Sequence, residues 1–240
     1  MMLLTRCNLK VLASAEGTVK IASQRRIPNM SQALLEPPLV EPPEAEPPLM
    51  LHLRPAVELT DDQFFALCAI NRDLRLERTA EGDIIIMPPT GFATGIRNAE
   101  INRQFGNWAK RDGRGVAVGS STGFKLPNGA ERSPDAGWVL CSRLELLTPE
   151  QKQKFLPLAP DFLIELKSRT DRLKDILAKM DEYIENGVPL GWLINPETQR
   201  VHIYRPAKPI EILEAPSQVS GDPELPGFVL DLREIWEPNI

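Results

Sequence analysis

The chain is poor in the residues that build disulfide frameworks and soft metal sites. Its 240 residues include three cysteines and two histidines. The cysteines, Cys7, Cys68 and Cys141, lie far apart without a Cys-x-x-Cys pair, so neither a disulfide framework nor a zinc knuckle is encoded. Two histidines without a His-Glu-x-x-His motif exclude a histidine-rich metal site. Any metal bound here is therefore expected to be a hard cation held by oxygen atoms.

Long apolar runs are also missing. No stretch approaches the ~18 uninterrupted apolar residues that a membrane-spanning helix needs. Residues 1–25 carry Arg6, Lys10 and Lys20 among short apolar pairs, which is unlike the continuous apolar segment of a secretory signal. We therefore expect a cytoplasmic protein without a membrane partner. A net charge of -5 argues against bulk electrostatic coating of nucleic acid and leaves room for a locally basic groove.

Proline, by contrast, is concentrated near the N-terminus. Six of the twelve residues from Pro37 to Pro48 are proline, in three pairs with glutamates between them. Because proline fixes φ and lacks an N–H, this segment favours an extended spacer. We expect residues 1–48 to form a disordered or extended tail and residues 49–240 a single domain. A ligand for a proline-binding partner is the alternative function of the tail.

Helical and strand periods alternate along residues 60–206. Helices are expected from Thr60, at 94–111, after Pro149 and at 171–186. Strands are expected at 75–78, 83–87, 116–118, 123–126, 137–140, 162–167, 190–194 and 201–204, the last two as a hairpin. Ile101, Phe105 and Trp108 recur at helical spacing, so one face of their helix should pack inward. The pattern predicts a mixed α/β domain.

The strand at 162–167 carries two charges among apolar neighbours. Alternation places Glu165 and Lys167 on one face and Ile164 on the other. A carboxylate and an ammonium ~7 Å apart suit a divalent cation beside a water or a phosphate. The Glu-x-Lys spacing alone is common, and its bland alternative is an ion pair on an amphipathic strand. The apolar surroundings favour a functional site.

A hard cation needs a second carboxylate, and two Pro-Asp pairs compete for that role. Asp161 shares the face of Glu165 but lies four residues away, about 13 Å along an extended strand. Asp135 opens a separate strand that can pair beside Glu165, so we choose Asp135, with a simple turn as its alternative. Two carboxylates ~4 Å apart repel by roughly 4 kcal/mol at an effective dielectric of 20, which a bound cation would relieve.

The order of these motifs resembles the PD-(D/E)xK nuclease superfamily and, more closely, the Uma-two (Uma2) family of restriction endonucleases. The resemblance spans roughly residues 59–206. It rests on Thr90-Gly91, Arg97 to Asn102, Ser121 to Gly129, Arg132 to Asp135, Glu165 to Lys167, Lys179 to Tyr183, Gly187-Val188 and Trp192 to Pro196. It implies a restriction-endonuclease-like core, with a central mixed β-sheet flanked by helices, and a metal-dependent DNA endonuclease.

The resemblance also implies a site. Asp135, Glu165 and the main-chain carbonyl of Leu166 would hold Mg²⁺, with Mn²⁺ as a possible substitute and no organic cofactor. Lys167 would polarise or help deprotonate a water that attacks the phosphodiester. Glu100, on the preceding helix, would complete the outer metal shell, with a surface ion pair as its alternative.

A second lysine competes with Lys167. Relatives without lysine at that place draw the amine from the following helix, which here points to Lys179. We prefer Lys167 and otherwise expect Lys179 to be solvent-exposed. Tyr183, Trp138 and Trp192 are interpreted as packing residues.

The charge distribution and the chemistry of duplex cleavage suggest the partners. Residues 97–132 hold seven basic and three acidic side chains, which suits DNA, although a charge-laced solvated helix would look similar. A homodimer is expected, because two sites related by a two-fold axis can cut both strands. The alternative to an endonuclease is a catalytically silent nucleic-acid-binding or self-associating module with the same fold.

Overall fold

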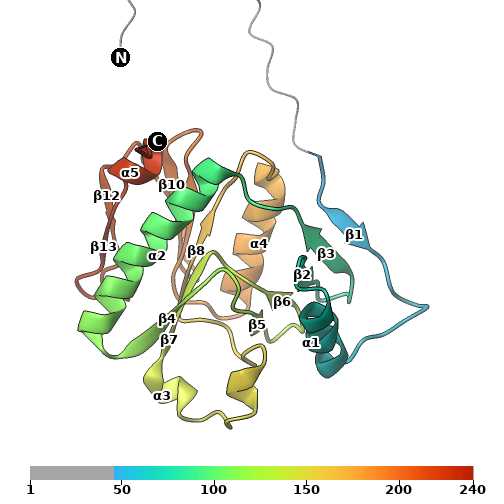
Figure 1. The fold of residues 1–240 in the computed structure, drawn as a ribbon. Helices are drawn as coiled ribbons and strands as arrows, with labels where there is room; N and C mark the ends of the chain where they lie inside the picture. Colours follow the sequence, from blue (N-terminus) through green and yellow to red (C-terminus); the bar gives the residue numbers. More distant parts are fainter. Residues whose placement is uncertain (1–45, 240) are drawn as a thin grey trace, which may run out of the picture. The chain divides into compact units, whose positions relative to one another are not determined.

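A six-stranded sheet in the order β11-β10-β9-β8-β7-β4 is the centre of this computed structural model, which describes residues 46–239 (Figure 1). Its strands are β4 (Gly115–Gly119), β7 (Ala136–Leu140), β8 (Phe162–Leu166), β9 (Gly191–Asn195), β10 (Arg200–Tyr204) and β11 (Glu211–Glu214). Strands β8 and β9 are parallel and are joined through helix α4 (Leu173–Glu185), whereas the other neighbouring pairs are antiparallel. The expected hairpin is confirmed as β9 and β10.

Helix α2 (Phe92–Asp112) covers one face of this sheet (Figure 1). Its Ile101, Phe105 and Trp108 are buried as their spacing predicts, and they share a hydrophobic cluster with Phe162 and Ile164 of β8. The Phe105 and Phe162 rings meet edge to face with centroids 5.4 Å apart, a favoured aromatic geometry. The even-numbered side chains of β8 therefore belong to the α2 face.

Helix α4 covers the opposite face. Its buried Met180 and Tyr183 lie in a second hydrophobic cluster, which includes Leu163 of β8. Because side chains alternate along a strand, Glu165 shares the face of Leu163 and is directed toward α4. The two helices and the sheet confirm the expected mixed α/β architecture with a central mixed sheet flanked by helices.

A five-stranded sheet in the order β1-β3-β2-β6-β5 is formed mainly by the N-terminal part of the described chain. Its strands are β1 (Leu49–Leu51), β2 (Arg75–Arg78), β3 (Ile84–Met87), β5 (Phe124–Lys125) and β6 (Glu131–Arg132). Helix α1 (Asp61–Ile70) begins at Thr60, whose side chain accepts a hydrogen bond from Gln63 N–H while the Gln63 side chain accepts one from Thr60 N–H. This reciprocal cap confirms the predicted helix start.

The remaining elements are short. They are α3 (Cys141–Leu144), a 3-10 turn at Gln151–Gln153, β12 (Gln218–Ser220), β13 (Val229–Asp231) and α5 (Arg233–Trp236). The prediction of a polar helix after Pro149 is wrong, because only the 3-10 turn forms there. The backbone of Leu156 instead hydrogen-bonds with that of Gly123 and Lys125. Leu156 also precedes Pro157, and a residue before proline avoids the helical region of φ and ψ.

The expected tail, residues 1–48, falls almost entirely outside the described residues. Within residues 46–239, no helix combines the length and the apolar character needed to cross a bilayer.

Candidate active site

Asp135 immediately precedes β7, which pairs antiparallel with β8. Its Oδ2 accepts a hydrogen bond from Leu166 N–H at 2.9 Å, and its Oδ1 accepts one from Asn98 Nδ2 at 3.2 Å. Asn102, one turn further along α2, donates to the main-chain oxygen of Asp135 at 3.2 Å. The buried carboxylate is therefore fixed between the end of β8 and helix α2.

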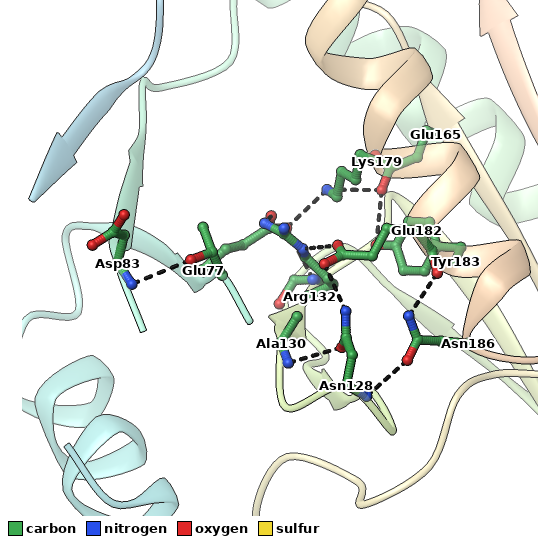
Figure 2. Close-up of polar contacts among 12 residues, drawn as sticks. Glu77, Asp83, Asn128, Ala130, Arg132, Glu165, Lys179, Glu182, Tyr183 and Asn186 are labelled. Carbon is green, nitrogen blue, oxygen red and sulfur yellow. Dashed lines mark hydrogen bonds and ion pairs between the residues drawn. The ribbon is translucent and has the colours of Figure 1, made fainter. Parts of the chain in front are cut away.

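Glu165 of β8 is buried against α4 and receives two hydrogen bonds from that helix (Figure 2). Its Oε1 accepts from Lys179 Nζ at 2.8 Å and from the Tyr183 hydroxyl at 3.0 Å. Lys179 and Tyr183 are four residues apart, so they occupy the same side of the helix and reach the same strand. Tyr183 is a packing residue, as expected, but its hydroxyl also belongs to the site.

Burial raises the pKa of both carboxylates, and the charge of Asp135 also acts on Glu165. Burial raises the pKa of Glu165 to about 7; Lys179 opposes this, while the negative charges of Asp135 and Glu77 act in the same direction as burial. Burial likewise raises the pKa of Asp135, against the opposing effects of the Leu166 N–H, Arg75 and Lys179. Asp135 and Glu165 are called the acidic pair below, and their joint use as a metal site stays a prediction.

Asp161, the rejected candidate, lies elsewhere. Its carboxylate accepts hydrogen bonds from Leu140 N–H at 2.9 Å and from Arg143 Nη1 at 2.8 Å. These contacts give Asp161 a structural role beside β7.

Lys179, and not Lys167, is the lysine at the carboxylate pair. The ammonium of Lys167 instead contacts Glu197 Oε2 at 2.6 Å and the carbonyl of Ser168 at 3.0 Å. Strand β8 ends at Leu166, so the Lys167 side chain extends toward the turn that follows β9. The preference for Lys167 therefore has no support in this geometry.

The expectation that Lys179 is solvent-exposed is wrong, because only 14% of its side chain is accessible. Burial alone would lower the pKa of Lys179, but the charges of Glu165 and Glu77 outweigh burial and raise it. The amine is therefore a fixed cation at neutral pH.

Glu100 is not brought to the acidic pair. Its carboxylate accepts hydrogen bonds from Arg103 at 2.5 and 2.7 Å and from Gln104 at 2.8 Å. A helix turns by about 200° over two residues, so Glu100 faces away from Asn98, which contacts Asp135. The surface ion pair given as the alternative for Glu100 is the arrangement that forms.

Glu77 of β2 is a buried carboxylate that sequence reasoning missed (Figure 2). It lies 2.8 Å from Lys179 Nζ, on the side away from Glu165. Burial alone would raise the pKa of Glu77, but the cations Lys179 and Arg132 lower it. The segment Leu76-Glu77-Arg78 resembles any amphipathic strand, so the sequence around Glu77 contains no signal for this role.

The oxygen atoms at the acidic pair fit a hard divalent cation in kind. Asp135 and Glu165 supply two buried carboxylates, and the amide oxygen Asn98 Oδ1 beside Asp135 is buried without a hydrogen-bond partner. Within residues 46–239, no group of three or more His, Cys, Asp or Glu side chains is arranged to hold a metal. A cation here would therefore depend on the two carboxylates together with neutral oxygens.

The basic excess of residues 97–132 is largely neutralised by ion pairing. Arg103, Arg114, Lys125 and Arg132 each pair with a carboxylate. Summed charge along this segment is therefore a weak indicator of a DNA-binding surface.

The fold is that of the restriction-endonuclease-like class. The family profile described as "Uma2: Putative restriction endonuclease" matches residues 61–233, and the chain belongs to this family. A crystal structure described as a "putative nuclease belonging to DUF820" from Anabaena variabilis is similar in fold, with a TM-score of 0.62 and 20% sequence identity. The similarity covers 74% of this chain and 97% of that one. No curated protein matches the sequence. The expected family and fold are confirmed.

Proposed function

We propose that the protein is a divalent-metal-dependent nuclease that hydrolyses phosphodiester bonds in DNA. Family membership supports a nuclease. The observation that carries the proposal is the contact of Lys179 Nζ with Glu165 Oε1 at 2.8 Å, in a buried site that also contains Asp135. Two coupled acids and a fixed cation are the groups that metal-assisted phosphodiester hydrolysis uses.

Asp135, Glu165 and the carbonyl of Leu166 would hold the cation, Mg²⁺ or Mn²⁺. A hard cation at these oxygens supplies positive charge that favours hydroxide at neutral pH and offsets the charge developing on the phosphate. Asp135 is already oriented toward Leu166 by its hydrogen bond to the Leu166 N–H. Because Glu165 has a pKa near 7, binding a cation would displace its proton, and affinity should increase with pH.

Lys179 has an electrostatic role in this proposal. Its raised pKa keeps the amine protonated, so it stabilises negative charge on the phosphate and does not remove a proton from water. Tyr183 donates to the same Oε1 of Glu165 that contacts Lys179. Glu165 Oε2 lies outside both contacts, and α4 thus holds the carboxylate in one orientation.

Nicking of supercoiled plasmid by purified protein tests this proposal. With Mg²⁺ or Mn²⁺ the wild type should cleave, and EDTA should abolish cleavage. Glu165→Gln and Lys179→Met should each lower the rate by about 100-fold or more, the magnitude typical of a lost electrostatic contact to the transition state. Lys167→Met is the matched control and should cleave at close to the wild-type rate.

Two outcomes would redirect the assignment. Cleavage that persists in Glu165→Gln would remove the acidic pair from the mechanism. A folded wild type that neither binds Mn²⁺ in a calorimetric titration nor cleaves DNA would leave the catalytically silent module as the function.

A homodimer is part of this proposal, because two such sites can act on the two strands of a duplex. Sedimentation equilibrium tests it directly, and a monomer at micromolar concentration with and without DNA would contradict it.

A further inference from the structure

We propose that Glu77 is a positioning residue of this site, which holds the Lys179 ammonium and the segment that carries Asp135 in fixed places relative to Glu165. The inference rests on the nuclease function proposed above. Glu77 comes from β2 in the five-stranded sheet, whereas Glu165 comes from β8 in the six-stranded sheet. The site is therefore supported from two separate sheets.

Three donors converge on the Glu77 carboxylate. Oε1 accepts from Lys179 Nζ at 2.8 Å and from Ser133 N–H at 2.9 Å. Oε2 accepts from Arg132 Nη1 at 3.3 Å. Glu77 is only 4% exposed. If its carboxylate were removed, water could therefore do little to replace it as the acceptor for these three donors.

Lys179 is held from both sides. Its Nζ lies 2.8 Å from Glu77 Oε1 and 2.8 Å from Glu165 Oε1. A lysine stem has four rotatable bonds, so a single contact leaves its end free to swing, whereas two opposed carboxylates define one position. Without the charge of Glu77, the whole attraction of the ammonium would fall on Glu165, the residue that is needed for the cation.

The contact of Glu77 with Ser133 also helps to fix the position of Asp135. Ser133 precedes Asp135 by two residues, and Pro134 between them restricts the backbone. The hydrogen bond from Ser133 N–H to Glu77 therefore fixes the start of the segment 133–135. Asp135 Oδ2 fixes the end of that segment by accepting a hydrogen bond from Leu166 N–H. Arg132, which also contacts Glu77, pairs with Glu182 of α4 at 2.6 Å. One carboxylate thus links β2, the Asp135 segment and α4.

Glu77→Gln is the informative substitution because glutamine keeps the size of glutamate but has one acceptor oxygen. Its amide NH₂ would face N–H groups, so at least one of the three donors loses its partner. Glu131→Gln is the matched control. Glu131 lies on β6 in the same sheet, is 2% exposed and pairs with Arg78 at 3.1 Å. It is an equally buried carboxylate of the same sheet, with its ion pair to Arg78 and not to Lys179.

The experiment measures kcat and KM for plasmid cleavage by the full chain in Mg²⁺. Glu77→Gln should lower kcat by about 10- to 100-fold, the cost of misplacing groups by about 1 Å, with KM changed less than about twofold. Glu131→Gln should retain the wild-type kcat. The double variant Glu77→Gln/Lys179→Met should lose less than the product of the two single losses, because part of the effect of Glu77 passes through Lys179.

A second readout does not need activity. Amide hydrogen exchange at Leu166 reports on its bond to Asp135, and it should be faster in Glu77→Gln and unchanged in Glu131→Gln. If Glu77→Gln does not fold, the same measurements are made on Glu77→Asp. Aspartate keeps the negative charge but places it one methylene further from Lys179 and Ser133.

The inference is overturned if the folded variant cleaves with the wild-type kcat, or if the losses of Glu77→Gln and Lys179→Met multiply. If the wild type itself does not cleave, the proposed function fails separately. Exchange then decides alone: faster exchange at Leu166 supports positioning by Glu77, and unchanged exchange refutes it.

Discussion

A buried carboxyl group with a pKa near 7 opposes folding at neutral and alkaline pH, so replacing Glu165 by glutamine should stabilise the protein as it removes activity. The pKa of Glu165 is about 7, against 4.5 for an unperturbed glutamate. At 1.36 kcal/mol per pKa unit, this difference amounts to about 3 kcal/mol of unfolding free energy. Glutamine resembles the protonated acid in shape and stays neutral at every pH.

The pH dependence follows from the direction of this pKa change. Below pH 4.5 the carboxyl is protonated in both the folded and the unfolded chain, so it imposes no penalty. Between pH 4.5 and 7 the unfolded chain ionises first, and the wild type loses stability as pH rises. Above pH 7 the loss is constant. Glu165→Gln should therefore match the wild type near pH 4.5 and exceed it by about 3 kcal/mol at pH 8.

Urea denaturation in EDTA at pH 4.5, 6 and 8 measures these differences, and thermal unfolding at pH 8 should show a gain of roughly 6–12 °C for a domain of this size. Glu185→Gln, at the exposed end of α4, is the control and should change little at any of the three pH values. A Glu165→Gln variant no more stable than the wild type at pH 8 would refute the raised pKa of Glu165, because the opposing effect of Lys179 is already included in that pKa.

Asp135→Asn should abolish nicking. It should leave the protein at least as stable at pH 8, because burial raises the pKa of Asp135, and a large drop in the free energy of unfolding in urea would contradict this. Saturating Mn²⁺ should raise the thermal midpoint at pH 8 and much less at pH 5.5, where protons compete for Glu165, and equal gains would count against this site. Gly115→Ala should lose about 1–3 kcal/mol in urea denaturation, because its Cβ would lie 2.4 Å from Trp138. Gly106→Ala, with nothing within 4 Å of its Cβ, is its control and should be neutral or slightly stabilising.

The neighbouring placement of the strands that carry Asp135 and Glu165 could be predicted from the sequence, because its determinants are local. Alternation along 162–167 defines the face of Glu165, and of the two Pro-Asp pairs only Asp135 opens a separate strand, because Asp161 lies about 13 Å from Glu165 on the same strand. These patterns depend on the period of each strand and not on distant contacts. The structure confirms that the two strands are neighbours.

The choice of lysine could not be made in the same way. Lys167 is paired with Glu197, thirty residues later, and Lys179 with Glu77, about a hundred residues earlier. The destination of a long side chain depends on which charges the tertiary fold brings within reach, and no local period encodes that. The position of Glu100 depends on the rotation of its helix about its own axis, which only the contact of Asn98 with Asp135 reveals.

The distribution of the site over two sheets has a consequence for how activity would arise in a newly made chain. The strand with Glu77 is synthesised roughly ninety residues before the strand with Glu165, and the helix with Lys179 comes later still. A partly synthesised chain therefore contains Glu77, and then Glu165, without the lysine that pairs with both carboxylates. The contacts of Lys179 with Glu77 and Glu165 can therefore form only after strands from both sheets and helix α4 are in place.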